Sequence, residues 1–388
     1  LDSIPMIAMD EGWFAFYAYD EFGQNPYPTS SNIQYKLFFL YPFLLSLWMK
    51  VFGISLFAVR AFSVVIGALG VIGLYKLLKV SHIKQRFVYG GLFTFLMTNI
   101  VFVTFRWGRP EGVILVLLIW AIYYLLNALK EKKERLFIFV GLLLGLMVLA
   151  HPYSVLVPMS LLLILWRMPI NLRSAYLYLI YGGGIVVFLM ALKGFVFDFD
   201  YVQTHLFSHV FDRVSVNSSS QPLLSRLIYF WDSYTLGVKR LYILMFEIII
   251  LIVGFFRYRK DPIISNLSLL GLITFILGLL FLSPFRRRYM GIVMIFSLLT
   301  SIFIVIKEKN SLKKGVVFAM FLYVSNNMLG NFYYSYTHIN NTSYQKLSHE
   351  IRAYIPQDAK ILAPIQFWIA LSPYYTLTDI HDQIRLKD

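Results

Sequence analysis

Residues 58–78 read AVRAFSVVIGALGVIGLYKLL, and this stretch decides the class of fold. It carries no charge between Arg60 and Lys76, and its length matches the roughly 20 residues that a helix needs to cross a bilayer. The rest of the chain has the same character: of 388 residues, 59% are hydrophobic and only 14% are charged, and the mean hydropathy is +0.67. The sequence therefore predicts an all-α polytopic membrane protein.

The sequence contains ten candidate spans of this kind, and we expect a fold with about 10–11 transmembrane helices. The segments 136–150 and 154–167 are shorter than a straight crossing requires, and Ala150-His151-Pro152 separates them. Residues 36–53 contain Pro42 and Lys50, which favours helices that lie at the membrane interface or re-enter it. The ten predicted spans are 58–78, 87–105, 112–129, 136–150, 154–167, 174–195, 240–256, 263–283, 289–306 and 314–330.

Basic residues lie in alternate turns between these spans. If residues 1–35 are extracytoplasmic, all five cytoplasmic turns are basic, as the positive-inside rule requires. These turns explain much of the net charge of +15, which arises from 35 Lys+Arg against 20 Asp+Glu, so no nucleic-acid partner is needed. The chain has no cysteine, which excludes disulfides and thiolate metal sites. The five turns run from Lys76 to Arg86, Lys130 to Arg135, Arg167 to Arg173, Arg257 to Asp261 and Lys307 to Lys314.

A few cations break this pattern on the extracytoplasmic side. They are Lys36, Arg109 in the turn Arg106-Trp107-Gly108-Arg109-Pro110-Glu111, and Arg287 and Arg288 in the turn before Tyr289. Charges at the ends of spans on the unfavoured face are costly, so they suggest a fixed anion on that face. Arginine suits a phosphate because its planar fork donates two hydrogen bonds at once. Binding of lipid headgroups is the alternative explanation.

Two adjacent carboxylates, Asp10 and Glu11, lie in a segment, residues 1–35, that has no Lys or Arg. Such a pair is either part of a solvated loop or part of a site. Three cationic positions on the same face, from segments far apart in the sequence, favour the site. The combination of carboxylates, cations and an apolar helical wall predicts a pocket that binds a lipid phosphate. In this pocket a soluble group would attack the head of the bound lipid.

Histidines offer two weaker candidates. His205 and His209 would share one helical face and could hold a divalent metal, but an amphipathic interfacial helix is the more economical interpretation of residues 196–238. His151 precedes Pro152, which is typical of a helix end because proline suits the first turn of a helix. No metal or other cofactor is required by these patterns, although a divalent metal is possible.

The chain resembles the polyprenol-phosphate-sugar-dependent glycosyltransferases of GT-C fold. Within that superfamily it is most similar to the group of protein O-mannosyltransferases and lipid A aminoarabinose transferases. The similarity covers essentially the whole chain, although each motif is short. The residues that carry it are Asp10-Glu11, Tyr35-Lys36-Leu37, Tyr41-Pro42, Val51-Phe52-Gly53-Ile54-Ser55, Ala58-Val59-Arg60, Arg109-Pro110-Glu111, Arg288-Tyr289 and Ile355-Pro356-Gln357-Asp358-Ala359-Lys360.

The resemblance implies roles for particular residues. It implies that Asp10 is the catalytic base and Glu11 its acidic neighbour. It places Lys36, Arg288 and Tyr289 around the donor phosphate, and the sequence pattern adds Arg109 to that set. Further site candidates are Glu111, which takes a place where relatives often have Asp, His151, which stands where many relatives carry Lys, and Arg287.

The sequence also departs from the family pattern. Tyr35, Leu37 and Phe38 replace the His and the two Pro residues that flank the lysine in relatives. The family's first span is not found in the chain, so we expect it to be missing. We expect a transmembrane catalytic domain at 1–330, in which 1–57 form an extracytoplasmic loop with interfacial helices. Residues 331–388 are expected to form a small, truncated extracytoplasmic α/β segment, with helices at 344–354 and 365–371 and a strand at 359–363.

Two functions are compatible with these features. The first is an inner-membrane glycosyltransferase that moves a sugar from a polyprenyl-phosphate donor to a hydroxyl of an extracytoplasmic glycan, lipid or protein, by direct displacement with inversion. The second is a transporter or flippase of lipid-linked saccharides, in which the same cations bind phosphate without chemistry. Transporters tend to show internal repeats and charges near the middle of the bilayer, neither of which is found here, so the enzyme is favoured. The sugar and the acceptor are left open.

Overall fold

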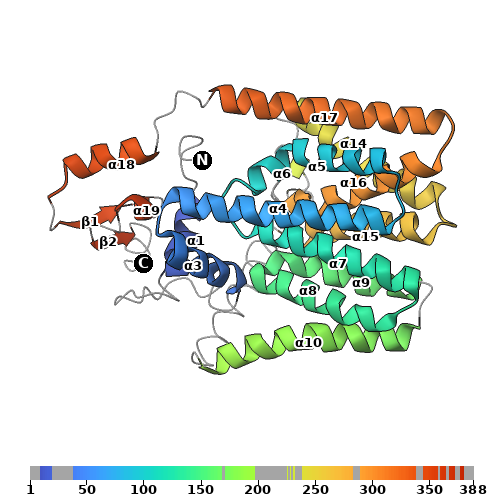
Figure 1. Cartoon of the computed structure of the whole chain (residues 1–388), viewed down its shortest axis with the longest axis horizontal. Coiled ribbons are helices and arrows are strands. Elements are labelled where there is room, and N and C mark those ends of the chain that lie inside the picture. Colours follow the sequence, from blue (N-terminus) through green and yellow to red (C-terminus); the bar gives the residue numbers. More distant parts are fainter. Residues whose placement is uncertain are drawn as a thin grey trace.

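The computed structural model describes residues 9–19, 38–167, 171–196, 238–282, 289–337, 344–356, 359–363, 367–371 and 376–379, together with 225, 228, 230 and 231. The described chain is a helical bundle with a small α/β segment at one end (Figure 1). The helices of the bundle are α4 (Leu56–Val80), α5 (Gln85–Met97), α6 (Asn99–Thr104), α7 (Glu111–Glu131), η2 (Glu134–Leu136), α8 (Phe137–Ala150), η3 (Pro152–Val155), α9 (Leu156–Ile164), η4 (Leu165–Arg167), α10 (Leu172–Val196), α14 (Val238–Arg257), α15 (Pro262–Phe281), α16 (Met290–Lys307) and α17 (Ser311–Thr337).

Each predicted span coincides with helix over most of its described residues. Five helices in the described part are long and apolar enough to cross a membrane, and this confirms a multi-pass membrane protein. Two short apolar helical segments match expectations from the sequence: 136–150 corresponds to α8, and η3, α9 and η4 together make a helical segment from Pro152 to Arg167. The five long helices are Leu56–Val80, Glu111–Glu131, Arg173–Leu192, Pro262–Phe281 and Met290–Lys307.

The span predicted at 87–105 is not continuous. Helix α5 ends at Met97, and α6 begins at Asn99 after an extended residue, Thr98. Within a membrane, a broken helix is tolerated when other groups satisfy the freed backbone. Here α17 does so, because the Asn99 N–H donates to Asn327 Oδ1 at 2.8 Å and the Asn331 amide donates to the carbonyl of Met97 at 3.2 Å. The sequence prediction of one straight helix was therefore wrong at this point.

The basic turns all lie at one end of the bundle, and helices α1 (Met9–Tyr19) and α3 (Leu40–Phe52) lie at the other (Figure 1). Contacts tie the turns to one another. The Lys130 ammonium donates to the carbonyl of Val80, Lys313 lies 5.3 Å from the centre of the Phe87 ring, and Arg257 pairs with Glu308 at 3.3 Å. This segregation of charge is what the positive-inside rule predicts for a single orientation across a bilayer.

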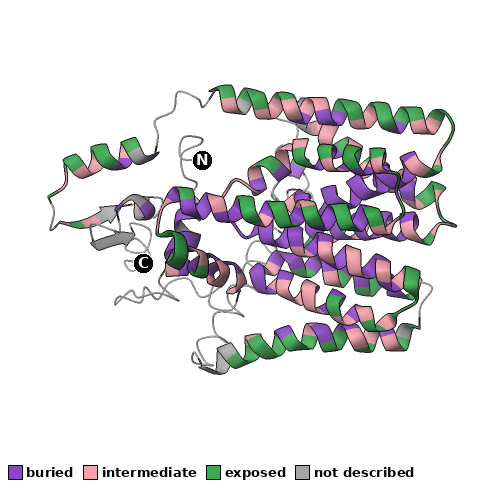
Figure 2. Cartoon of the chain, viewed as in Figure 1, coloured by how far each residue is buried: buried purple, intermediate pink, exposed green. Residues whose placement is uncertain are grey.

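The interior of the bundle is built around α16. Of its most apolar stretch, 89% of the residues are buried, against 22% for α10, which lies along one side of the bundle (Figure 2). Helix α10 and helix α17 present exposed residues along their length, as expected for helices that face lipid. The predicted interfacial segment forms α3, which buries Tyr41, Leu45 and Met49 and leaves Phe52 exposed.

Glycines let α8 and α10 pack backbone against backbone. A Cβ added at Gly182 would overlap the carbonyl oxygen of Ile138, and one added at Gly141 would overlap that of Leu179. Small residues at such contacts are the usual means by which membrane helices approach closely, because lipid supplies no hydrophobic drive for association.

Gly182→Ala is therefore expected to destabilise the protein by about 1–3 kcal/mol, since the overlap is with backbone that cannot rotate away. Gly184→Ala is the matched control: a Cβ there meets nothing within 4 Å, and alanine favours helix by about 1 kcal/mol over glycine. Unfolding of the two variants in mixed detergent micelles measures the difference. Equal stability of the two would contradict the close packing of α8 and α10.

The C-terminal segment contains α18 (Tyr344–Ala353), β1 (Lys360–Ala363), α19 (Trp368–Leu371) and β2 (Thr376–Asp379). Strands β1 and β2 pair in parallel, with Lys360 opposite Thr376 and Ala363 opposite Asp379. The predicted helix at 344–354, strand at 359–363 and helix within 365–371 are confirmed, whereas β2 was not foreseen. Helix α19 contacts α1, so this segment lies at the end of the bundle that carries the Asp10-Glu11 sequence (Figure 1).

Candidate active site

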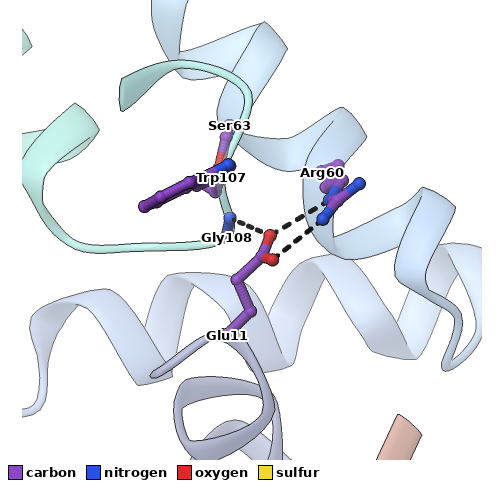
Figure 3. Close-up of polar contacts among 5 residues, drawn as sticks. All are labelled: Glu11, Arg60, Ser63, Trp107 and Gly108. Atoms are coloured by element: carbon purple, nitrogen blue, oxygen red, sulfur yellow. Dashed lines mark hydrogen bonds and ion pairs between the residues drawn. The ribbon is translucent and has the colours of Figure 1, made fainter. Parts of the chain in front are cut away.

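A fully buried ion pair joins α1 to α4 (Figure 3). The side chains of Glu11 and Arg60 are both 0% exposed. Arg60 donates from Nη2 to Glu11 Oε2 at 2.9 Å and from Nε to Oε1 at 3.1 Å, and the Gly108 N–H donates to the same Oε1 at 2.9 Å. A bidentate pair with an added backbone donor holds a carboxylate in one position.

The first turns of α4 hold the other parts of this arrangement. Ser55 caps the helix by accepting from the N–H of Ala58 at 3.0 Å, and the Trp48 indole of α3 donates to the Ala58 carbonyl at 2.8 Å. One turn further, the Ser63 hydroxyl donates to the carbonyl of Trp107 at 2.7 Å (Figure 3). Helix α4 therefore fixes both α3 and the turn before α7, while Arg60 fixes α1.

The turn between α6 and α7 passes very close to α4 at Gly108. A Cβ at this position would overlap Cγ1 of Val59, and Glu11 Oε1 would lie 3.7 Å from it. Only glycine allows the backbone N–H to reach the Glu11 carboxylate here.

We expect Gly108→Ala to lower the stability of the protein by about 1–3 kcal/mol, because Val59 or the turn must move and the hydrogen bond to Glu11 is strained. The double variant Gly108→Ala with Val59→Ala removes the obstructing methyl group and should recover part of that loss. Thermal unfolding of the single and double variants measures this, and an equal or larger loss in the double variant would rule out the steric explanation.

A second ion pair lies at the start of α7. Arg109 donates from Nη2 to Glu111 Oε1 at 3.0 Å and from Nε to Oε2 at 3.2 Å, and the two side chains are only 9% and 6% exposed. The Arg109 guanidinium also lies 6.0 Å from the centre of the Trp107 ring. Glu111 is in the first helical turn, where a negative charge interacts favourably with the helix dipole.

Tyr41 of α3 is close enough to both ion pairs for their charges to act on its hydroxyl. Its hydroxyl is buried, and burial, followed by the charge of Glu11, raises the pKa of Tyr41 well above its ordinary value. Glu111 and Arg109 act on the same hydroxyl more weakly. Tyr41 is therefore a neutral hydroxyl group set among charged side chains.

Three aromatic rings lie together near the start of α16, and one of them, Tyr153, is close to the Arg109–Glu111 pair. The Tyr153 and Tyr289 rings lie 4.2 Å apart between centres, and the His151 ring lies 4.9 Å from Tyr153 and 6.5 Å from Tyr289. Glu111 and Arg109 are close enough to the Tyr153 hydroxyl to act on it electrostatically. His151 ends α8 and caps η3, with Pro152 in the first position, so the predicted helix-end role is confirmed.

The described residues bring several predicted positions together. Glu11, Arg109, Glu111, His151 and Tyr289 lie at the same end of the bundle, linked by the contacts above. Asp10 precedes Glu11 in α1. Lys36, Arg287 and Arg288 lie outside the described residues, as do His205 and His209.

Sequence reasoning missed Arg60, Gly108 and Ser63 as parts of the site. Arg60 was visible as a charge in the first turn of an apolar span on the unfavoured face, the same signal that pointed to Arg109. In the described part of the chain, no group of three or more His, Asp or Glu side chains could hold a metal ion.

Comparisons with known proteins agree with this architecture. Residues 39–192 match the family described as dolichyl-phosphate-mannose-protein mannosyltransferase. The fold is similar to the crystal structure of ArnT from Cupriavidus metallidurans bound to undecaprenyl phosphate, with a TM-score of 0.60 and 11% sequence identity, over 98% of this chain and 82% of that one. No curated protein sequence matches the chain.

The family match and the shared fold confirm the resemblance drawn from the sequence motifs. The chain has a fold similar to the GT-C fold of that structure, and part of it, residues 39–192, matches a family of membrane mannosyltransferases.

Proposed function

We propose that the protein transfers a sugar from a polyprenyl-phosphate donor to a hydroxyl group of an extracytoplasmic acceptor. The observation that carries this proposal is the Glu11 carboxylate. It joins α1, α4 and the turn before α7 in one buried cluster, at the end of the bundle opposite the basic turns. The similarity of the fold to a protein bound to undecaprenyl phosphate supports a lipid phosphate as the carrier.

Asp10 is the proposed general base. It directly precedes Glu11, so the same buried pair that fixes Glu11 fixes the backbone of Asp10 at the edge of the cluster. Glu11 itself is held by Arg60 and Gly108, so its proposed role is to position α1, and Asp10 is the carboxylate assigned to the proton transfer.

In the proposed reaction the acceptor oxygen attacks the anomeric carbon, and the bond from that carbon to the phosphate oxygen breaks. Asp10 accepts the hydroxyl proton, and the polyprenyl phosphate leaves with the bonding electrons. A single displacement inverts the anomeric configuration. Since the leaving group is a phosphate monoester, the chain needs positive charge near it rather than an acid.

Lys36, Arg109, Arg288 and Tyr289 are proposed to bind that phosphate. The position of Arg109 supports this role, because its charge acts on the Tyr153 hydroxyl and the Tyr153 ring packs 4.2 Å from that of Tyr289. Arg109 shares its charge with Glu111, which keeps the guanidinium fork oriented in the absence of donor. His151 and Tyr153 complete an aromatic wall next to this position.

The test is release of polyprenyl phosphate in proteoliposomes. A panel of polyprenyl-phosphate sugars is supplied with a membrane extract as acceptor, and the released lipid phosphate and the anomer of the product are measured. Release that requires the acceptor, with an inverted product, is the expected result. Movement of intact lipid-linked sugar across the bilayer with no release from any donor would replace the transferase by a flippase.

A further inference from the structure

A cavity of about 650 Å³ opens at the opposite end of the bundle from the candidate active site. It is formed by the turn between α14 and α15 and by the end of α16. Four cationic side chains line it: Arg257, Arg259, Lys260 and Lys307. The proposed transfer reaction uses none of them.

Two of these cations are neutralised within the protein. Lys307 pairs with Asp261, which also caps α15 by accepting from the N–H of Ile263 at 3.0 Å. Arg257 pairs with Glu308 at 3.3 Å. The Tyr258 hydroxyl donates to Glu308 at 2.7 Å, and this hydrogen bond lowers the pKa of the Glu308 carboxyl, so Glu308 remains ionised.

The other two cations, Arg259 and Lys260, make no ion pair with any residue in the described part of the chain. They are adjacent and exposed at the mouth of the cavity. The paired residues give the cavity a fixed rim, and Arg259 and Lys260 give it an unbalanced positive charge. A ligand that bears about one or two negative charges would balance it.

Apolar surface adjoins this basic mouth. Phe256 lines the cavity and is 59% exposed. A second cavity of about 330 Å³, lined almost entirely by apolar side chains, lies between α14 and α17. It reaches Val253, one turn before Phe256, and Leu312, at the start of α17. Basic side chains at the end of a membrane helix, followed along the same helix by an apolar groove, fit a molecule with an anionic head and hydrocarbon chains.

We propose that this surface binds an anionic phospholipid, with its phosphate at Arg259 and Lys260 and an acyl chain along the groove between α14 and α17. Arginine and lysine differ here in what they contribute. Arg259 can hold two phosphate oxygens at once, and Lys260 adds a point charge. This site is separate from the proposed sugar transfer, and neither depends on the other.

The test compares lipid binding to the whole purified protein by native mass spectrometry. Phosphatidylglycerol is titrated against phosphatidylcholine of the same chain length. Wild type is expected to retain phosphatidylglycerol in preference to phosphatidylcholine. The double variant Arg259→Gln with Lys260→Gln is expected to weaken that binding roughly 30-fold, because each of the two basic residues contributes a similar free energy of attraction to anionic lipid. Both residues are exposed, so the folded bundle should be unaffected, and unfolding temperature checks this.

The matched control is Lys309→Gln with Lys314→Gln, which removes two exposed lysines from the same end of the bundle but outside the cavity. Its loss of affinity should be about threefold at most, because only screened, longer-range attraction is removed. Equal losses in the two double variants, or equal binding of the two lipids by wild type, would overturn the proposal. Competition by glycerol phosphate at the same concentration as lipid would also overturn it, in favour of a soluble phosphate ester.

Discussion

Asp10→Asn is expected to lower the rate of sugar transfer by roughly 10²–10⁴-fold, the range in which general-base catalysis contributes. The amide is almost the same size as the carboxylate but cannot accept the proton of the acceptor hydroxyl. Glu11 and Arg60 are untouched, so α1 should keep its place and the donor should still bind. Single-turnover release of polyprenyl phosphate measures the rate, and equilibrium binding of a donor analogue measures the affinity.

A second readout separates a base from a merely structural carboxylate. If Asp10 is the base, the decline of the wild-type rate at acidic pH should be absent from the residual activity of Asp10→Asn. Glu131→Gln is the control, because Glu131 is about half exposed at the opposite end of the bundle, where it pairs with Lys133. A rate within about threefold of wild type for Asp10→Asn would remove Asp10 from the mechanism, since general-base catalysis contributes far more than that.

Arg60→Met should destabilise the protein by about 3–5 kcal/mol, because it leaves the Glu11 carboxylate buried without its counter-charge. Glu11→Gln should cost a similar amount, since it leaves the guanidinium buried without its own. The double variant should lose much less than the sum of the two, because removing both charges leaves no uncompensated ion. Chemical unfolding of the four proteins in detergent gives this coupling energy.

The same series tests the positioning role of the pair. Because Arg60 and Glu11 hold α1 against α4, loss of the pair should lower transfer by Asp10 even where the protein remains folded. Arg60→Lys keeps the charge but removes the bidentate fork, so it should retain more stability than Arg60→Met and yet transfer more slowly than wild type. Additive stability losses, or full transfer activity in a folded Arg60→Met, would contradict the assignment.

Much of the fold could be predicted because membrane helices are encoded locally. Span 58–78 could be identified from its own composition, and α4 occupies Leu56–Val80. The basic turns could be assigned to one end by charge alone, because the cost of placing cations on the wrong side is large for each turn separately. The acidic pair Asp10-Glu11 could also be singled out from the local sequence, because it lies in a segment without Lys or Arg.

Other features depend on residues that are distant in the sequence. The break at Thr98 was not predicted, because the groups that make it tolerable, Asn327 and Asn331, lie more than two hundred residues further along the chain. Strand β2 was missed because only one of its four residues, Leu377, is apolar, whereas β1 is a mostly apolar run that marks a strand by itself.

The sequence by itself determined that the chain is a multi-pass membrane protein, where most of the described helices lie, and that the basic turns share one end of the bundle. Only the tertiary structure decided how Glu11 and Arg109 are paired. Glu11 had no basic partner nearby in sequence, yet Arg60, 49 positions away, and the Gly108 N–H, 97 positions away, both bind it. Arg109, predicted to bind the donor phosphate, is paired with Glu111. The hydropathy and charge of a segment decide by themselves how that segment lies in the bilayer. The formation of an ion pair depends instead on which segments pack together in the fold.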